Sequence, residues 1–313
     1  MLRRTLGARH LCTPDRTTTH FGFRTVDESD KERLVGNVFD SVASNYDVMN
    51  DLMSAGIHRA WKDIFVRMLG VGAQSSANLQ VLDVAGGTGD IAFRIADELS
   101  THPAATSVHD DEQARVVVCD INKQMLDEGR QRAAKLDPSR TAGWPRMDWI
   151  VADAQKLPFD DASFDVYTIA FGIRNVTRIP EALSEVRGSP RLARPAHSHA
   201  TAPTPAPARW RQAHRVLRPG GRFLCLEFSR VNNALLREAY RQYSFHVIPK
   251  IGGLVANDAA SYQYLVESIQ RFPPQEDFAQ MLRDAGLRHV SHSSLTGGIV
   301  AVHSGIKIGG GAR

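Results

Sequence analysis

The chain has 313 residues, of which 42% are apolar and 23% charged, and these fractions are typical of a globular protein of one large domain or two ordinary ones. It has no run of 18 apolar residues, so a membrane-spanning helix is not expected. Its formal charge of +4 comes from residues 1–24, at +4, and residues 186–212, at +5, which leave −5 for the remainder. Because the basic character is confined to two segments, it does not indicate a nucleic-acid surface. The three cysteines are too widely spaced to predict a disulfide framework or a zinc site.

The first 24 residues contain five arginines and no acid before Asp15. They also lack the long apolar core of a secretory signal. We therefore predict a mitochondrial presequence over 1–24, with an ordinary disordered terminus as the alternative. The folded domain is expected over 25–307, followed by a tail at 308–313.

Residues 30–70 have apolar residues at helical spacing with a break near Ser54–Gly56, which predicts an N-terminal helical cap of two or three helices. Asn122 is expected to cap the helix that follows the second strand. Beyond the cap, apolar runs alternate with amphipathic stretches, and five buried strands are expected within residues 78–99, 115–121, 147–159, 164–173 and 222–228.

The C-terminal part predicts three helices and a pair of strands. Residues 233–251 are expected to be helical until Pro249, and further helices should lie within 261–270 and 275–286. Residues 287–305 predict two strands around a glycine pair. Strands that alternate with helices and end in a hairpin predict a mainly parallel, doubly wound α/β sheet with an antiparallel C-terminal edge.

Residues 186–212 are a compositional outlier between two segments that resemble the halves of one helix. They contain five of the 15 prolines and five arginines, but few large apolar side chains. Prolines forbid a continuous helix, and so little apolar surface cannot offset the entropy of ordering, so we predict a disordered insertion. Joining its flanks would place Leu183, Val216 and Leu217 on a common face.

The edges of this insertion suggest an origin. Its first residue, Val186, has codons that begin with GT, and its last, Gln212, can be encoded by CAG. Those letters are the expected boundaries of an intron. We therefore hypothesise that the segment is an intron read through in frame.

The strongest functional signal is LDVAGGTGD at 82–90, a glycine turn between an apolar run and an amphipathic helix. The glycines allow the backbone to turn tightly and to approach a ligand at the helix N-terminus. The GxGxxG spacing of dinucleotide-binding proteins is only partly met. The spacing Asp83-x-Ala85-x-Gly87-x-Gly89 instead resembles motif I of class I S-adenosylmethionine-dependent methyltransferases, with alanine in place of its first glycine.

Two further strand ends agree with this resemblance. Asp120 ends the second strand, where an acid can accept hydrogen bonds from a ribose diol, and the third strand is followed by a segment that lies beside the adenine in that fold. The resemblance therefore implies S-adenosylmethionine as the cofactor and a set of cofactor-binding residues, namely Asp83, Gly86, Gly87, Thr88, Gly89, Asp120, Asp153 and Ala154.

Longer blocks narrow the resemblance to one family. VFDSVASNYDVMNDLMSAGIHRAWK, VCDINKQML, TIAFGIRNV, RVLRPGGRFLCLEFS and SYQYLVESIQRFP are similar to blocks of the quinone C-methyltransferase family of ubiquinone and menaquinone biosynthesis. The similarity covers about residues 20–306. A short presequence and the segment 186–212 depart from the family's pattern.

The resemblance implies transfer of a methyl group from S-adenosylmethionine to a ring carbon of a polyprenylated benzoquinol. A ring carbon ortho or para to a hydroxyl becomes nucleophilic as the hydroxyl loses its proton, so this chemistry needs alignment, exclusion of water and charge stabilisation, but no metal. Arg174 and Asn175, after the fourth strand, are the predicted catalytic residues. Arg174 would stabilise a developing phenolate, or alternatively form a structural ion pair, and Asn175 would orient the hydroxyl or a methionine carboxylate.

A substrate pocket is also expected. Tyr46 and Asp47, in the helical cap, could close over the cofactor. Asp47 could act as a base, with a helix-capping residue as the alternative. The segment around Tyr243 and His246 is expected to line the quinol pocket, with core packing as the alternative for each residue. Further apolar lining is expected from Phe245, Ile248 and Tyr262.

The family also implies a location and partners. A polyprenylated substrate resides in a membrane, so a peripheral protein on the matrix face of the mitochondrial inner membrane is expected, with the amphipathic stretch 234–251 toward lipid. A multiprotein coenzyme Q synthesis complex and a homodimer are further implications, whereas no nucleic-acid partner is expected.

Two other functions compete with this interpretation. A nicotinamide oxidoreductase would need a more complete phosphate-binding fingerprint than residues 82–90 provide. A catalytically impaired isoform that acts only as a scaffold of the synthesis complex is the second, because of the insertion at 186–212.

Overall fold

The computed structural model describes residues 17–42, 50–51, 54, 56–70, 78–101, 114–183, 212–255 and 258–309. Tyr46, Asp47 and residues 186–211, which carry several of the predictions above, lie outside these ranges. The prediction of a presequence likewise falls outside them for residues 1–16.

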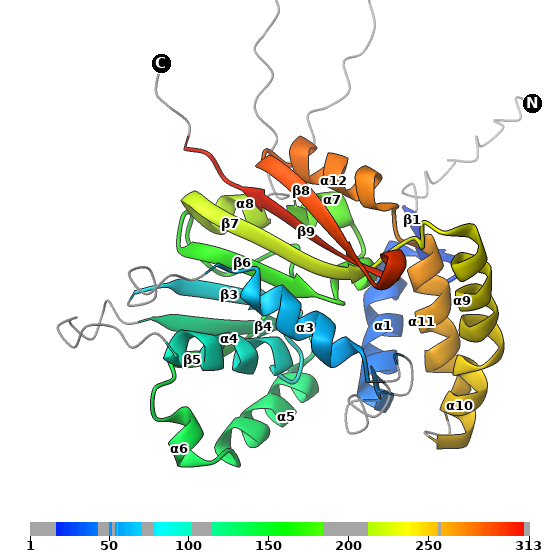
Figure 1. Cartoon of the computed structure of the whole chain (residues 1–313), viewed down its shortest axis with the longest axis horizontal. Coiled ribbons are helices and arrows are strands. Elements are labelled where there is room, and N and C mark those ends of the chain that lie inside the picture. Colours follow the sequence, from blue (N-terminus) through cyan, green and yellow to red (C-terminus); the bar gives the residue numbers. More distant parts are fainter. Residues whose placement is uncertain are drawn as a thin grey trace, which may run out of the picture.

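Within the described residues, a seven-stranded sheet runs in the order β5-β4-β3-β6-β7-β9-β8 (Figure 1). Neighbouring strands from β5 to β7 are parallel, whereas β9 is antiparallel to both β7 and β8. The predicted doubly wound sheet with an antiparallel C-terminal edge is therefore confirmed. The strands are β3 Gln80–Val84, β4 Arg115–Asp120, β5 Arg146–Val151, β6 Phe164–Ala170, β7 Leu217–Phe228, β8 Arg288–Leu295 and β9 Val300–Ile306.

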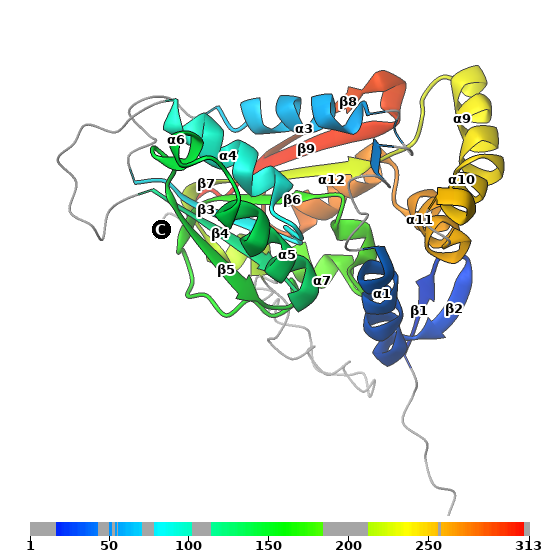
Figure 2. The same cartoon turned by 90° about the horizontal axis from the view of Figure 1, so that it is seen from below.

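Helices cover both faces of this sheet, as Figure 2 shows. Alternate residues of each strand point to opposite faces, so Val81 packs with one apolar cluster and its neighbour Leu82 with the other. The cluster around Val81 is covered by α3 His58–Arg67, α4 Asp90–Ser100 and α5 Lys123–Ala134. The cluster around Leu82 is covered by α7 Ile179–Leu183, α8 Gln212–Val216 and α12 Gln275–Asp284. The short α6, Pro138–Thr141, leads into β5.

The carboxyl edge of the parallel strands is capped by further elements (Figure 1). These are the hairpin β1 Thr18–Phe21 and β2 Arg24–Asp27, helix α1 Glu28–Val42, and the group α9 Ala234–His246, α10 Ile248–Val255 and α11 Ala259–Arg271. Two short 3-10 turns, η3 Ile173–Asn175 and η4 Thr296–Gly298, complete the described elements. Of the region predicted as a helical cap, α1 lies at the carboxyl ends of the strands, whereas α3 packs on a face of the sheet.

The hairpin corrects the prediction that residues up to 24 are disordered. Phe21 is buried and stacks on Tyr264 of α11, with ring centroids 4.1 Å apart. The backbone N–H of Phe23 donates to the Glu267 carboxylate at 2.9 Å. The composition of this stretch shows no such partners, because they lie more than 240 positions away in the sequence.

Three other expectations need correction. The helix expected to end at Pro249 is two helices, and Pro249 is the second residue of α10, where a missing N–H is tolerated. The fifth strand begins at Leu217, five residues earlier than expected, so Leu217 is in the strand rather than in a helix. The predicted insertion ends one residue too late, because Gln212 is buried as the first residue of α8, and its side-chain oxygen accepts from the Leu157 N–H at 3.0 Å.

The two sides of the insertion meet in the core. Leu183 at the end of α7 and Val216 at the end of α8 are both fully buried and belong to one apolar cluster, together with Leu217. Helices α7 and α8 also contact each other. The three side chains thus share one cluster, but from two helices and a strand, and the common helical face expected after removal of 186–212 stays a prediction.

Candidate cofactor site and active site

The glycine turn between β3 and α4 is closely packed. A Cβ on Gly86 would lie 2.6 Å from Val118, and one on Gly89 would lie 2.6 Å from Trp149. Gly87 and Gly89 have φ values of +53° and +82°, which favour glycine. Ala85, in place of the motif's first glycine, has a φ of +52°, so this position holds a side chain in a left-handed conformation.

Two carboxylates, one buried and one partly buried, lie beneath and beside this turn. Asp83 accepts from the Thr168 hydroxyl at 2.7 Å, while its second oxygen is buried without a hydrogen-bond partner among the described residues. Burial, with repulsion from Asp120, raises the pKa of Asp83 to about 7. Asp120 accepts from the backbone N–H groups of Gly87 and Asn122, at 2.9 and 2.8 Å. Burial raises the pKa of Asp120 to about 6 in spite of these bonds.

A cavity lies at the carboxyl ends of β3, β4 and β6. Five residues predicted from the sequence line it, from four separate segments of chain: Gly87, Asp120, Asp153, Ala154 and Asn175. The other four predicted cofactor-binding residues do not line this cavity and instead pack within or beneath the glycine turn: Asp83, Gly86, Thr88 and Gly89. Thr88, for example, is buried and accepts from Arg132 at 3.0 Å.

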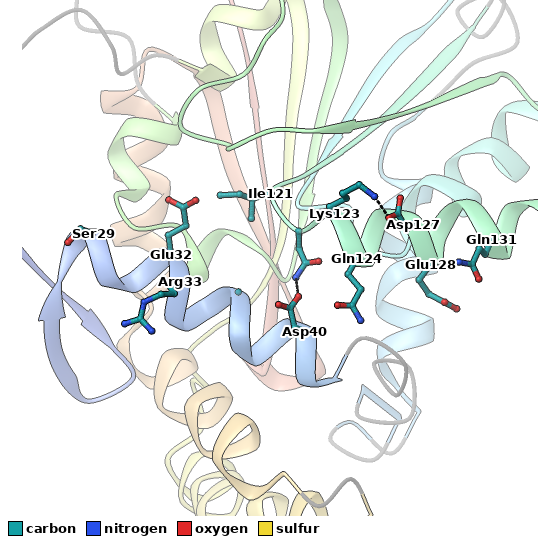
Figure 3. A pocket seen from close by; sticks show the side chains of 12 residues that line it. Ser29, Glu32, Arg33, Asp40, Ile121, Lys123, Gln124, Asp127, Glu128 and Gln131 are labelled. Atoms are coloured by element: carbon teal, nitrogen blue, oxygen red, sulfur yellow. Dashed lines mark hydrogen bonds and ion pairs between the residues drawn. The ribbon is translucent and has the colours of Figure 1, made fainter.

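Helix α1 forms the opposite wall of this cavity, through Glu32, Val35, Gly36 and Phe39. A groove of about 930 Å³ runs between α1 and α5 and shares Glu32, Gly36, Ile121 and Asn122 with the cavity. Figure 3 shows this groove, with Asn122 donating to Asp40 across it at 2.8 Å. The cavity is thus continuous with an open groove at the Asp120 end.

Asn175 has an unusual environment. Its side-chain oxygen accepts from the Tyr264 hydroxyl at 3.0 Å, which fixes the orientation of the amide. Its Nδ2 is buried and has no hydrogen-bond partner among the described residues. Because a buried donor without an acceptor is unfavourable, this amide is suited to a ligand oxygen in the cavity.

Arg174, the other predicted catalytic residue, points elsewhere. It is 7% exposed and its Nη1 pairs with Glu227 at 2.8 Å and donates to the Phe171 carbonyl. Its Nε is buried without an acceptor among the described residues. Arg174 lines a second cavity of about 390 Å³, which shares Val176 and Thr177 with the first. The ion pair expected as the alternative for Arg174 is therefore present.

The segment predicted to line a quinol pocket lies in the cap. Tyr243 is half-buried and packs with Ile248 and Tyr262 in a small apolar cluster that includes Phe39, a residue of the cavity wall. His246 is exposed at the end of α9. Neither Tyr243 nor His246 lines the cavities described above, so the structure brings Tyr243 near the site through Phe39 and leaves His246 outside it.

Sequence reasoning missed Phe171 and Glu227. Phe171 lines the cofactor cavity with a φ of +55°, and Glu227 is 1% exposed near the end of β7. A charged residue inside the apolar run RFLCLEF was the available signal for Glu227, because such a residue is rarely buried without a partner.

The open, mainly parallel sheet, the glycine turn and the acid that ends β4 define a class I S-adenosylmethionine-dependent methyltransferase. Two solved structures share the fold. A putative methyltransferase of Haloferax volcanii, in complex with the methyltransferase activator Trm112, is 15% identical with a TM-score of 0.51, and the match covers 87% of this chain and 98% of that one. An S-adenosylmethionine-dependent methyltransferase of Thermotoga maritima, described as a possible histamine N-methyltransferase, is 16% identical with a TM-score of 0.50 and the same two coverages.

The sequence comparisons are more specific. The model of the ubiE/COQ5 methyltransferase family matches residues 25–193 and 204–307, and the chain belongs to this family. It is 48% identical to the human 2-methoxy-6-polyprenyl-1,4-benzoquinol methylase, mitochondrial, over 97% of this chain and 89% of the human one. The Oryza sativa protein of the same name is also 48% identical, over 93% and 88%. The chain is a methyltransferase whose cofactor is S-adenosylmethionine.

Proposed function

We propose that this protein methylates a ring carbon of 2-methoxy-6-polyprenyl-1,4-benzoquinol in ubiquinone biosynthesis. The substrate is taken from the printed names of relatives that are 45–48% identical over most of their length. The observation that carries the proposal is the cavity at the ends of β3, β4 and β6, where the Asp120 carboxylate and the free Asn175 amide lie on one wall and apolar side chains of α1 on the other.

The residues present fit the cofactor. Asp120 is held by two backbone N–H groups and keeps lone pairs for a ribose diol, while Asp153 and Ala154 line the next part of the cavity. A side chain at Gly87 would approach Met125 to 3.2 Å and crowd the approach to this wall. When bound, S-adenosylmethionine supplies an electrophilic methyl group on a sulfonium.

We place the reacting ring at the turn 174–177, where the two cavities share Val176 and Thr177. The ring hydroxyl would first lose its proton to water. The ring carbon would then form a bond to the methyl carbon as the methyl–sulfur bond breaks with its electrons going to sulfur, which would leave S-adenosylhomocysteine, and the proton of the ring carbon would pass to water. Asn175 orients the ring hydroxyl with its free N–H, and the free Nε–H of Arg174 stabilises the phenolate charge directly or through water. Phe171 and Phe39 exclude bulk water from the cavity.

The deciding experiment is a methyl-transfer assay. Purified protein is incubated with S-adenosylmethionine and the reduced 2-methoxy-6-prenyl-1,4-benzoquinol analogue with a short tail, and the product is identified by mass spectrometry and NMR. A ring C-methyl product is expected. O-methylation, or no product with a chain that binds the cofactor, would overturn the proposal.

The same assay addresses the scaffold alternative. Deleting 186–211 keeps the buried Gln212 and joins the flanks whose side chains already meet in the core. Full-length and deleted chains should both be active, because no residue proposed for the chemistry lies in the deleted segment. An active deleted chain beside an inactive full-length chain would favour the scaffold function for the chain as it stands.

We further propose a peripheral location on the matrix face of the mitochondrial inner membrane. Relatives are named mitochondrial, and among the described residues no helix has both the length and the apolar character to cross a bilayer. Helix α9 exposes Leu235 at 82% and Leu236 at 39% on the cap. Flotation with quinone-containing liposomes should recover the protein, and Leu235→Asp should weaken recovery. The synthesis complex and the homodimer are proposed only from the family.

A further inference from the structure

The turn after β6 is held in place by a buried ion pair from β7. Glu227 Oε1 lies 2.8 Å from Arg174 Nη1, and the side chains of Glu227 and Arg174 are 1% and 5% exposed. The same carboxylate accepts from the backbone N–H of Phe228 at 2.8 Å and from that of Arg174 at 3.4 Å. Glu227 therefore binds both the backbone and the side chain of Arg174.

The pair also supports a strained residue. Phe171 has a φ of +55°, and its carbonyl accepts from the same Arg174 Nη1 that contacts Glu227. The Phe171 ring lies 4.9 Å from that of Phe228, centroid to centroid, and the Arg174 guanidinium lies 5.5 Å from the centroid of Phe228. Left-handed conformations of bulky residues persist only where the surroundings fix them. Here the Phe171 N–H donates to the Leu226 carbonyl at 2.7 Å, and its carbonyl accepts from Arg174, which Glu227 in turn holds.

This arrangement leaves specific atoms free for a ligand. With Nη1 occupied by Glu227 and Phe171, the buried Nε of Arg174 has no acceptor in the part of the chain that the structure describes, and neither does the Nδ2 of the adjacent Asn175. Both donors lie at the turn between the two cavities. A neutral side chain in place of Glu227 could not accept from Arg174 and from Phe228 with equal strength, because charge-assisted bonds are about twice as strong as neutral ones.

We propose that Glu227 is a positioning residue for methyl transfer, which acts through Arg174 by holding the guanidinium and the 171–175 turn so that the Arg174 Nε and the Asn175 amide face the substrate. This inference rests on the proposed function, because it assigns these two donors to the quinol.

The test is a double-mutant cycle with four proteins: the wild type, Arg174→Gln, Glu227→Gln and the double variant. Each single substitution should lower kcat for the short-tailed quinol analogue at least tenfold, with the Kd for S-adenosylmethionine changed less than threefold, because the proposed cofactor contacts are on other strands. The double variant should be no slower than Arg174→Gln, because the 3.4 Å contact of Glu227 with the backbone N–H at position 174 is too long to hold the turn without the guanidinium.

Arg218→Gln is the matched control. Arg218 of β7 pairs with Asp165 of β6 at 2.8 Å, so it is an ion pair of the same strand β7 near the amino ends of the parallel strands, away from the 171–175 turn. Its kcat should stay within twofold of the wild type. A Glu227→Gln protein within twofold of the wild type, or losses that multiply in the double variant, would overturn the inference.

Folding is monitored by circular dichroism, because removing one member of a buried pair leaves an uncompensated charge. If Glu227→Gln does not fold, the double variant, which removes both charges, decides: equality with Arg174→Gln supports the inference and a slower double variant overturns it. Failure of the proposed function is recognised separately, as a wild-type protein that forms no methylated product.

Discussion

The two ends of the parallel strands, called here the carboxyl edge and the amino edge of the sheet, have the same left-handed backbone conformations in different surroundings. At the carboxyl edge, Ala85 and Gly89 have φ values of +52° and +82° within the packed turn of the cofactor cavity. At the amino edge, Ala162 and Gly220 have φ values of +54° and +86°. Ala162 is exposed there, and a Cβ on Gly220 would meet nothing within 4 Å. The conformation alone therefore does not distinguish a functional turn from a connecting one.

Charge distribution separates the same two edges. The carboxyl edge contains the buried carboxylate of Asp83, the partly buried carboxylate of Asp120 and the buried pair of Arg174 with Glu227. The amino edge has the partly exposed pair of Arg218 with Asp165. Buried charge and tight packing coincide where the cofactor and substrate are proposed to bind, and this coincidence can be tested position by position.

The largest effect is expected from Gly89→Ala. The new methyl group would combine a left-handed conformation with a 2.6 Å approach to Trp149, so unfolding free energy should fall by about 3–4 kcal/mol. Gly220→Ala is the control, with nearly the same φ and open space, and should lose about 1–2 kcal/mol. Urea unfolding measures both. Equal losses would show that packing at the carboxyl edge adds nothing to the conformational strain.

Asp120→Asn should have the next largest effect, and on binding. An amide cannot accept from Gly87, from Asn122 and from a ribose diol as a carboxylate does, so affinity for S-adenosylmethionine should fall about 100-fold, or about 2.7 kcal/mol. Isothermal titration calorimetry measures the change. Asp165→Asn at the amino edge should bind the cofactor as the wild type does, and a similar loss there would contradict a local role for Asp120.

The pKa of Asp120 predicts a smaller, pH-dependent effect. Because burial raises this pKa to about 6, the carboxyl becomes protonated as the pH falls below about 6, and cofactor affinity should weaken by up to about tenfold, or about 1.4 kcal/mol, per pH unit. The group's contribution to stability has the opposite sign, since a raised pKa stabilises the fold at low pH and this contribution is lost as the pH rises through 6. Calorimetric Kd values from pH 5 to 8 should show the slope in the wild type and a flatter one in Asp120→Asn. Parallel slopes would assign the dependence to another group.

The smallest effect compares two alanines. Ala162→Gly should raise stability by about 0.5–1 kcal/mol, because glycine adopts a left-handed φ without the Cβ penalty. The gain in unfolding free energy from Ala85→Gly should be about 0.8 kcal/mol smaller than that from Ala162→Gly, because the Ala85 methyl group is packed and its contacts would be lost. This methyl group lies so close to Gly172 that a Cβ on Gly172 would be only 2.4 Å from it. Denaturant midpoints at matched slopes distinguish the two. A larger gain at Ala85 would mean that the family's glycine is the better residue there.

Local patterns were sufficient for the sheet and for half of the candidate site. Alternating apolar runs, the Asn122 cap and the glycine turn depend on neighbours in sequence, and the structure has each of them, with Asn122 accepting from Met125 at 3.0 Å. Parallel strands bring their carboxyl ends to one edge, so the convergence of Gly87, Asp120 and Asp153 followed from topology. The hairpin of β1 and β2 could not be predicted in this way, because its contacts are with Tyr264 and Glu267 of α11, which are distant in sequence.

The sequence by itself determined the class of protein, its family and the residues at the strand ends, because strand order and the glycine turn follow from local periodicity and from long matching blocks. Only the tertiary structure decided how Arg174 and Asn175 divide their roles. Adjacent residues in a 3-10 turn point in different directions, and their partners, Glu227 on β7 and Tyr264 on α11, are separated from them by more than 50 positions. Because a buried carboxylate must be paired, Glu227 holds Nη1 of Arg174, while Nε is left without an acceptor among the described residues.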